Sequence, residues 1–261
     1  MDLGIKGRVA LVTGGGGGLG GAIAAALGRE GARVVVADIN GDAAQAAAAE
    51  IAVSGADARG MAWDLADIDG IEVRLDEVRM AWGDVDILVN NTGGPPPTLA
   101  QGVAADDWDK YFRSMVTGVI KLTDAVLPGM SAKGWGRVIT STSSGVIAPI
   151  PNLGISNTLR AALLGWSKTL SREVARGGIT VNVVLPGRIA TQRIRQLDAA
   201  RAEREGCSID QVEKASTESI SVGRYGKPSE YGDTVAFLAS EAASYITGSV
   251  IRVDGGLIAS I

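Results

Sequence analysis

Five consecutive glycines, residues 14–18, stand between an apolar segment and an alanine-rich segment. The segment before them, 9–12, reads Val-Ala-Leu-Val and is typical of a buried parallel strand. The segment after them, 22–27, consists of strong helix formers. Glycine suits a tight turn between a strand and a helix, because it tolerates positive φ and lets a ligand approach the backbone. The chain therefore predicts a strand, a turn and a helix here.

The N–H groups in the first turn of such a helix face outward and suit a pyrophosphate. A flexible linker is the alternative, but a linker would not stand between a buried strand and a helix. The glycines satisfy G-x-G-x-x-G in two registers, so the pattern alone does not fix the role of each glycine. We predict that this turn binds a nucleotide.

Strand-like and helix-like segments alternate along the rest of the chain. The predicted strands are 33–37, 58–63, 85–89, 137–141, 180–185 and 249–253, and the predicted helices are 41–54, 106–127, 153–175 and 229–238. This alternation predicts an α/β protein with a doubly wound parallel sheet, the Rossmann fold, as a single domain over residues 1–261. Residues 193–222 are charged and irregular, and we interpret them as a mobile substrate lid.

Asp38 follows the second predicted strand, 20 residues after Gly18. At about this interval a carboxylate binds the adenosine ribose in a βαβ nucleotide fold, although an aspartate here could also cap the next helix. The carboxylate would repel a 2′-phosphate, and no Lys or Arg stands in the glycine turn or just after Asp38. The predicted cofactor is therefore NAD rather than NADP.

The composition excludes several kinds of chemistry. The chain has no histidine, which removes Ser-His-Asp hydrolysis, His-ligated zinc and imidazole catalysis, and we expect no metal site. The net charge of −4 and the lack of basic runs argue against nucleic acid as a partner. A single cysteine, Cys207, fits a reducing compartment. Because neither a signal peptide nor a membrane segment is visible, we expect a cytoplasmic protein with no membrane partner.

Five motifs along the chain have a specific order and spacing. They are Thr13-Gly14-x-x-x-Gly18-x-Gly20, Asp64-Leu65, Asn90-Asn91-Thr92-Gly93, Pro186-Gly187-x-x-x-Thr191 and the segment 246–256. In these motifs the chain resembles the short-chain dehydrogenases/reductases, in particular the 3-oxoacyl-acyl-carrier-protein reductase type. The resemblance implies an NAD(P)-dependent oxidoreductase that interconverts a small carbonyl and a secondary alcohol. It also implies a homodimer or homotetramer built partly from the helices 106–127 and 153–175.

The resemblance implies a role for each cofactor-binding position. The glycine turn would hold the pyrophosphate, Asp38 the ribose, the Asp-Leu pair the adenine, the Asn-Asn-Thr-Gly loop the adenosine side, and the loop after Pro186 the nicotinamide. The implied cofactor residues are Gly14, Gly18, Leu19, Gly20, Asp38, Asp64, Leu65, Asn91, Gly93, Arg160, Pro186, Ile189 and Thr191.

The catalytic positions depart from the family pattern. The family uses Asn, Ser, Tyr and Lys, with the last two spaced Y-x-x-x-K on the second long helix. Aligned on that helix, Ser156 takes the tyrosine position and Arg160 the lysine position. Ser143 lies 13 residues before Ser156, as the family's serine does, and Met115 takes the asparagine position. The implied catalytic residues are therefore Ser143, Ser156 and Arg160.

This departure bears on the proton that carbonyl reduction needs. Tyrosine suits the role because a nearby ammonium group lowers its pKa, whereas a serine hydroxyl is a far weaker acid. Arg160 can bind the nicotinamide ribose but is a poor proton shuttle. Two proton sources stay open. One is Tyr111, which could instead pack in the core or a subunit interface; the other is the substrate itself or a water held by Ser143 and Ser156.

Two functions follow. The first is an oxidoreductase that acts on a small, partly apolar molecule. We expect residues 146–150 to line its substrate site. The second is an NAD(H)-binding, catalytically impaired regulator or partner subunit of an active relative. We favour the enzyme. The apolar positions of the two long helices exceed what one face of a sheet should bury, which predicts a homo-oligomer; they include Val119, Leu122, Leu163, Leu164 and Trp166.

Overall fold

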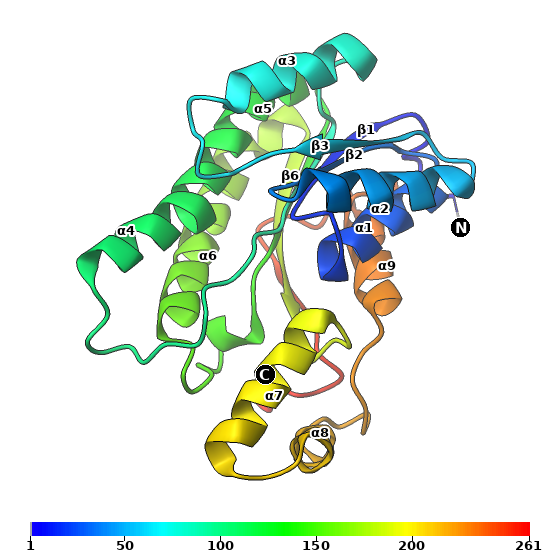
Figure 1. Ribbon diagram of the computed structural model, residues 1–261. Helices are drawn as coiled ribbons and strands as arrows, with labels where there is room; N and C mark the ends of the chain where they lie inside the picture. The colour runs from blue at the N-terminus through cyan, green and yellow to red at the C-terminus, as the bar shows by residue number, and fades with distance from the viewer. Residues whose placement is uncertain (1) are drawn as a thin grey trace.

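The computed structural model describes residues 2–261 and contains one parallel sheet in the order β3-β2-β1-β4-β5-β6-β7 (Figure 1). The strands are β1 Val9–Thr13, β2 Arg33–Asp38, β3 Ala58–Ala62, β4 Ile87–Asn90, β5 Gly136–Ser141, β6 Ile179–Pro186 and β7 Val250–Val253. The predicted single-domain Rossmann fold is confirmed. Because β1 pairs with both β2 and β4, the strand order reverses there, and a crevice opens beyond the carboxyl ends of these strands.

Helices cover both faces of the sheet (Figure 1). One face carries α1 Gly18–Arg29, α2 Gly41–Val53 and α9 Pro228–Leu238, and the other carries α3 Ile71–Trp82, α5 Gly118–Lys133 and α6 Gly154–Val174. Successive strand residues point to opposite faces. Ala10 and Val12 therefore pack with the α1 side, whereas Val9 and Leu11 pack with the α3 side. Helix α3 was not predicted.

The predicted helix 106–127 is longer and less uniform than expected. Helix α4 spans Ala105–Phe112, a π-helical turn occupies Arg113–Thr117, and α5 continues to Lys133. The predicted helix ends just before Pro128, a residue that removes a helical hydrogen bond. The helix nevertheless passes through this residue, since the next turn buries Met130 completely in the core.

The prediction that residues 193–222 are irregular is wrong. They contain α7 Gln192–Glu205 and α8 Ile209–Glu218, which lie together below the sheet in Figure 1. Helix α7 escaped detection because it is made mainly of charged and polar helix formers, which give no apolar period. Its buried Asp198 accepts hydrogen bonds from Arg188 at 2.6 Å and from the Tyr225 hydroxyl at 2.9 Å. These bonds tie α7 to the segments on either side of it.

The packing also corrects the premise of the oligomer prediction. Val119, Leu122 and Leu163 are buried within the protomer, so they need no partner subunit. Leu164 and Trp166 remain half-buried. Within residues 2–261, no helix has the length and apolar character needed to cross a membrane.

Candidate active site and cofactor cleft

The glycine turn leads from β1 into α1. Gly14 and Gly18 have φ of +55° and +56°, which favours glycine at both positions. A Cβ on Gly20 would lie 2.0 Å from the carbonyl oxygen of Gly14, so the turn also needs glycine for close packing. Gly17 caps α1 without a side-chain hydrogen bond, and nothing lies within 4 Å of the place its Cβ would take. The helix therefore presents free N–H groups to open space, which fits a phosphate group.

Thr13 and Asn91 join this turn to the end of β4. The Thr13 hydroxyl donates to the carbonyl oxygen of Asn91 at 2.9 Å and accepts from its N–H at 3.0 Å. The Asn91 side chain donates to the carbonyl oxygen of Gly14 at 3.1 Å. The Asn91 amide thus positions the glycine turn.

Asp38 lies at the end of β2, beside the same turn. Its carboxylate accepts hydrogen bonds from the N–H groups of Gly16 and Asn40, both at 3.0 Å. The cap of α2 is Asn40, whose side chain accepts from Ala43 at 3.1 Å. Asp38 therefore does not cap α2, which excludes the helix-cap role that the sequence left open for it. Its carboxylate stays close to the glycine turn.

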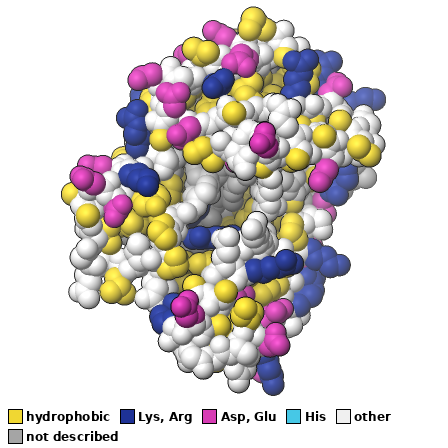
Figure 2. Space-filling model, viewed as in Figure 1, with side chains coloured by type: hydrophobic (Ala, Val, Ile, Leu, Met, Phe, Trp, Pro, Cys, Tyr) yellow, Lys and Arg dark blue, Asp and Glu magenta, His cyan; other side chains and the backbone are white. Residues whose placement is uncertain are grey.

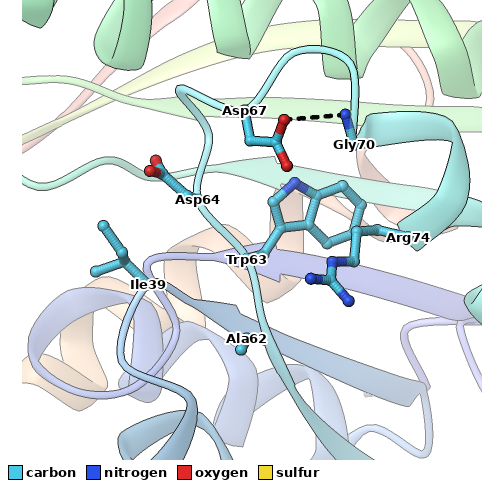
Figure 3. Close-up of a pocket in the computed structure, with 7 residues that line it drawn as sticks. All are labelled: Ile39, Ala62, Trp63, Asp64, Asp67, Gly70 and Arg74. Atoms are coloured by element: carbon cyan, nitrogen blue, oxygen red, sulfur yellow. Dashed lines mark hydrogen bonds between the residues drawn. The ribbon is translucent and has the colours of Figure 1, made fainter.

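A cavity of about 220 Å³ lies at the carboxyl ends of β2 and β3 (Figure 3). Asp64, predicted from the sequence, lines it, and Leu65 follows directly. The other lining residues are Ile39, Ala62, Trp63, Asp67, Gly70 and Arg74. Ile39 is 74% exposed and offers apolar surface to a flat ring. Arg74 was missed because it comes from the unpredicted helix α3; it is paired with Glu77 at 3.2 Å.

The three predicted catalytic residues come from two neighbouring segments. Ser143 follows β5, and its hydroxyl accepts from the N–H of Gly145 at 3.0 Å. Ser156 and Arg160 lie one turn apart on α6, and each is 8% exposed. The Arg160 guanidinium reaches the end of β4, where it donates to the carbonyl oxygens of Thr92 at 3.1 Å and Gly93 at 3.2 Å. The arginine therefore faces the crevice.

The comparisons with known proteins agree with this geometry. The family model described as enoyl-(acyl carrier protein) reductase matches residues 15–258. The 3-oxoacyl-[acyl-carrier-protein] reductase of Escherichia coli (strain K12) is 37% identical over 97% of this chain and 98% of its own length. This chain belongs to the short-chain dehydrogenase/reductase family. It is an NAD(P)-dependent oxidoreductase of that family, which favours the enzyme over the impaired regulator.

Two solved structures of the family are close in shape. L-sorbose reductase from Gluconobacter frateurii, complexed with NADPH and L-sorbose, has a TM-score of 0.94 at 32% identity and covers both chains fully. A xylitol dehydrogenase bound to NAD+ has a TM-score of 0.90 at 27% identity, covering 97% of this chain and 99% of its own. A nicotinamide dinucleotide is thus the cofactor type. The similar structures include both NADPH, which carries a 2′-phosphate, and NAD+, which does not.

The loop after β6 carries the fourth of the five family motifs. Pro186 ends the strand, and Ile189 is buried, with a β-bridge to Gly226. Thr191 caps α7 by accepting from the N–H of Ile194 at 3.4 Å. Its methyl group lies 3.9 Å from where a Cβ on Gly18 would be. The structure therefore brings this loop to the glycine turn, as the family motifs require.

The family's asparagine position is apolar here. Met115 lies in the π-helical turn, is 2% exposed, and packs against α6 in a cluster with Ile155 and Leu159. π-helical turns are frequent at functional sites. Tyr111 packs against the same cluster, which supports its core-packing role over that of proton donor.

Four buried polar atoms near the ends of β4 and β5 were not predicted. They have no hydrogen-bond partner within residues 2–261, and they are Asn90 Oδ1, Thr92 Oγ1, Thr140 Oγ1 and Thr142 Oγ1. Buried polar atoms are nearly always paired, so a polar ligand or water fits here. Threonines are common at strand ends, so the sequence alone does not indicate which of their hydroxyls are buried without a partner.

Proposed function

We propose that this protein uses NAD(H) to interconvert a small, partly apolar carbonyl compound and its secondary alcohol. The observation that carries the proposal is the Arg160 guanidinium at the end of β4, with Ser143 in the segment after β5 and Ser156 one turn before Arg160 on α6. The arrangement keeps a serine donor and a cation at the family's positions, although the tyrosine is absent.

In this proposal the cofactor extends along the carboxyl edge of the sheet. Gly14, Gly18, Leu19 and Gly20 hold the pyrophosphate, and the cavity with Asp64 and Leu65 holds the adenine. Gly93 and Asn91 border the adenosine side. Pro186, Ile189 and Thr191 border the nicotinamide, and Arg160 binds its ribose. The free N–H groups at Gly17 and the unpaired polar atoms of β4 and β5 support this placement.

The preference for NAD over NADP rests on Asp38. Its carboxylate is fixed beside the glycine turn by two backbone N–H groups, so it cannot easily move away from a 2′-phosphate. The cation that lines the neighbouring cavity, Arg74, is already paired with Glu77. A fixed negative charge without a free cation disfavours a phosphate.

A bound NADH would supply the hydride for the carbonyl carbon. The residues of this chain act on the carbonyl oxygen. Ser143 donates a hydrogen bond to it, and the Arg160 cation stabilises the negative charge that develops there. The developing alkoxide takes its proton from a water held between Ser143 and Ser156, and exchange with bulk solvent replaces the proton that this water gives up; the two hydroxyls position the water and are not the net source of the proton. Burial lowers the pKa of Arg160 to about 10, so it stays cationic at neutral pH.

The substrate contacts residues 146–150, where Ile147 and Ile150 are 38% and 36% exposed. Helices α7 and α8 serve as the lid over it. The protein assembles as a homodimer or homotetramer in the cytoplasm. Exposed apolar side chains support the assembly, among them Phe112 on α4 and Val250 on the edge strand β7.

The test is a panel of ketones and secondary alcohols followed by NADH absorbance, run beside a cofactor-binding titration. We expect NADH-dependent reduction of at least one partly apolar ketone. NADH binding without turnover on any member of the panel would instead support the regulator or partner subunit. Absence of both binding and turnover would overturn both functions.

A further inference from the structure

A second arginine reaches the crevice beside Arg160. Arg193, on the first turn of α7, donates from Nη2 to the carbonyl oxygen of Pro95 at 2.7 Å. A Cβ on Gly94 would lie 3.5 Å from Arg193 Nη2 and 3.7 Å from Arg160 Nη2. Two guanidinium groups from different helices therefore converge on one residue of the loop after β4.

Neither arginine has a carboxylate partner within residues 2–261. Their acceptors are the backbone carbonyl oxygens of Thr92, Gly93, Pro95 and Ser141. Burial lowers the pKa of both groups, and the charge of Arg193 lowers that of Arg160 further. Carbonyl oxygens orient a guanidinium but do not neutralise it. A buried cation beside a second, half-buried cation is unfavourable unless an anion lies near both.

The placement is notable in an acidic protein. The net charge is −4, yet Figure 2 shows Lys or Arg side chains inside the hollow between the sheet and the α7–α8 pair. A cleft lined by one sign of charge concentrates ligands of the opposite sign. Gly94 leaves room between the two guanidinium groups that a side chain would occupy. A carboxylate matches guanidinium donors in shape and charge.

We propose that Arg160, Arg193 and Gly94 form a subsite for an oxyanion, and we assign it to a carboxylate on the substrate. This inference rests on the proposed function and narrows its substrate to a small oxo acid or hydroxy acid. The apolar residues 146–150 then contact the carbon chain, while Arg193 donates to its charged end and Arg160, from its place at the nicotinamide ribose, adds a second positive charge. The cofactor's pyrophosphate has the same chemistry, but the uncapped N–H groups of α1 already provide for it.

The direct test is calorimetric binding to the NADH-loaded protein. Hexanoate and hexanamide serve as unreactive probes of similar size that differ in charge. We expect hexanoate to bind at least about 10-fold tighter, and Arg193→Gln to weaken hexanoate by about 10- to 100-fold while leaving hexanamide unchanged. Arg193→Lys should lose less affinity for hexanoate than Arg193→Gln, because it keeps the positive charge. The matched control is Arg195→Gln, on the exposed side of the same helix, which should change neither probe.

A second arm separates the two sources of the anion. NADH is titrated into Arg193→Gln without any carboxylate. An unchanged affinity for NADH assigns the subsite to the substrate. A loss of about 10-fold or more in NADH affinity, with the preference for hexanoate intact, would assign Arg193 to the pyrophosphate and overturn the proposal. Equal binding of hexanoate and hexanamide would also overturn it.

The kinetic arm compares 3-oxohexanoate with its methyl ester. We expect a higher kcat/KM for the acid than for the ester. Arg193→Gln should reduce this acid-to-ester ratio of kcat/KM by about 10- to 100-fold. Reduction of the ester as fast as the acid would contradict the subsite but leave the oxidoreductase function standing. If neither compound is reduced, the binding arms decide whether the subsite exists, and the ketone panel decides the proposed function.

Discussion

Arg160 donates a hydrogen bond from Nη2 to the carbonyl oxygen of Gly93 at 3.2 Å, which fixes a cation of α6 at the end of β4. Its pKa is lowered from 12.5 to about 10, with burial as the largest cause. The charge is therefore complete at neutral pH and is lost as the pH rises through about 10. If this charge acts in catalysis, the reaction rate should fall over the same pH range.

The first prediction concerns this pH dependence. The kcat/KM for ketone reduction should fall as the pH rises through about 10, because the oxyanion loses its stabilising cation. Arg160→Gln should show a low rate without this alkaline limb. Pre-steady-state assays at short exposure to high pH provide the measurement. A parent profile that stays flat to about pH 11 would contradict a role for the Arg160 charge.

The second prediction concerns the cofactor. NADH should bind at least about ten times tighter than NADPH, which corresponds to about 1.4 kcal/mol, because in the proposed binding mode Asp38 would face the 2′ position of the ribose. Asp38→Ser should narrow the difference by removing the negative charge. Fluorescence titrations of both cofactors on both proteins measure it. Equal affinities in the parent protein would contradict the assignment of NAD.

The third prediction concerns stability. The buried Tyr231 hydroxyl lies 2.9 Å from Ser141 Oγ and donates to the carbonyl oxygen of Val184 at 3.1 Å. Tyr231→Phe should lower the free energy of unfolding by about 1–2 kcal/mol, because it leaves buried partners unpaired. The control, Tyr245→Phe, changes a fully exposed residue and should have little effect. Urea denaturation measures the free energy of unfolding of both variants. Equal values for the two would contradict the packing described here.

The fourth prediction concerns assembly. Light scattering at micromolar protein should give the mass of a homodimer or homotetramer, since Phe112 and the edge strand β7 leave apolar surface uncovered. Phe112→Ser should shift the mass toward the protomer if α4 takes part. A parent protein with the mass of one chain would refute the assembly.

The sequence predicted the sheet and the turn because their signals are local. The buried strands read as continuous apolar runs, and the five glycines allow the positive φ that the tight turn at residues 14–18 needs. Helix α7 was missed because its side chains are mostly exposed, so burial imposes no apolar period on them. The path of α5 through Pro128 depends on the burial of Met130, which is a tertiary contact.

The site was predicted unevenly for the same reason. The sequence indicated Ser156 and Arg160 through their spacing on one helix. Arg193 gave no signal, because its meeting with Arg160 at Gly94 joins residues far apart in the chain. The unpaired threonine hydroxyls at the strand ends likewise appear only when the packing around them is known.

The most direct test of the altered catalytic set is the turnover number of six proteins on one activated ketone: the parent, Ser156→Tyr, Arg160→Lys, the double variant, Ser143→Ala and Arg160→Ala. The double variant restores an acid and the ammonium group that tunes it, so its kcat should exceed that of the parent by up to about 10²- to 10⁴-fold. Each single change should give less, and Ser143→Ala should lower the parent rate. A brisk parent rate that neither Ser143→Ala nor Arg160→Ala lowers, with no gain in the double variant, would place the chemistry elsewhere in the cleft.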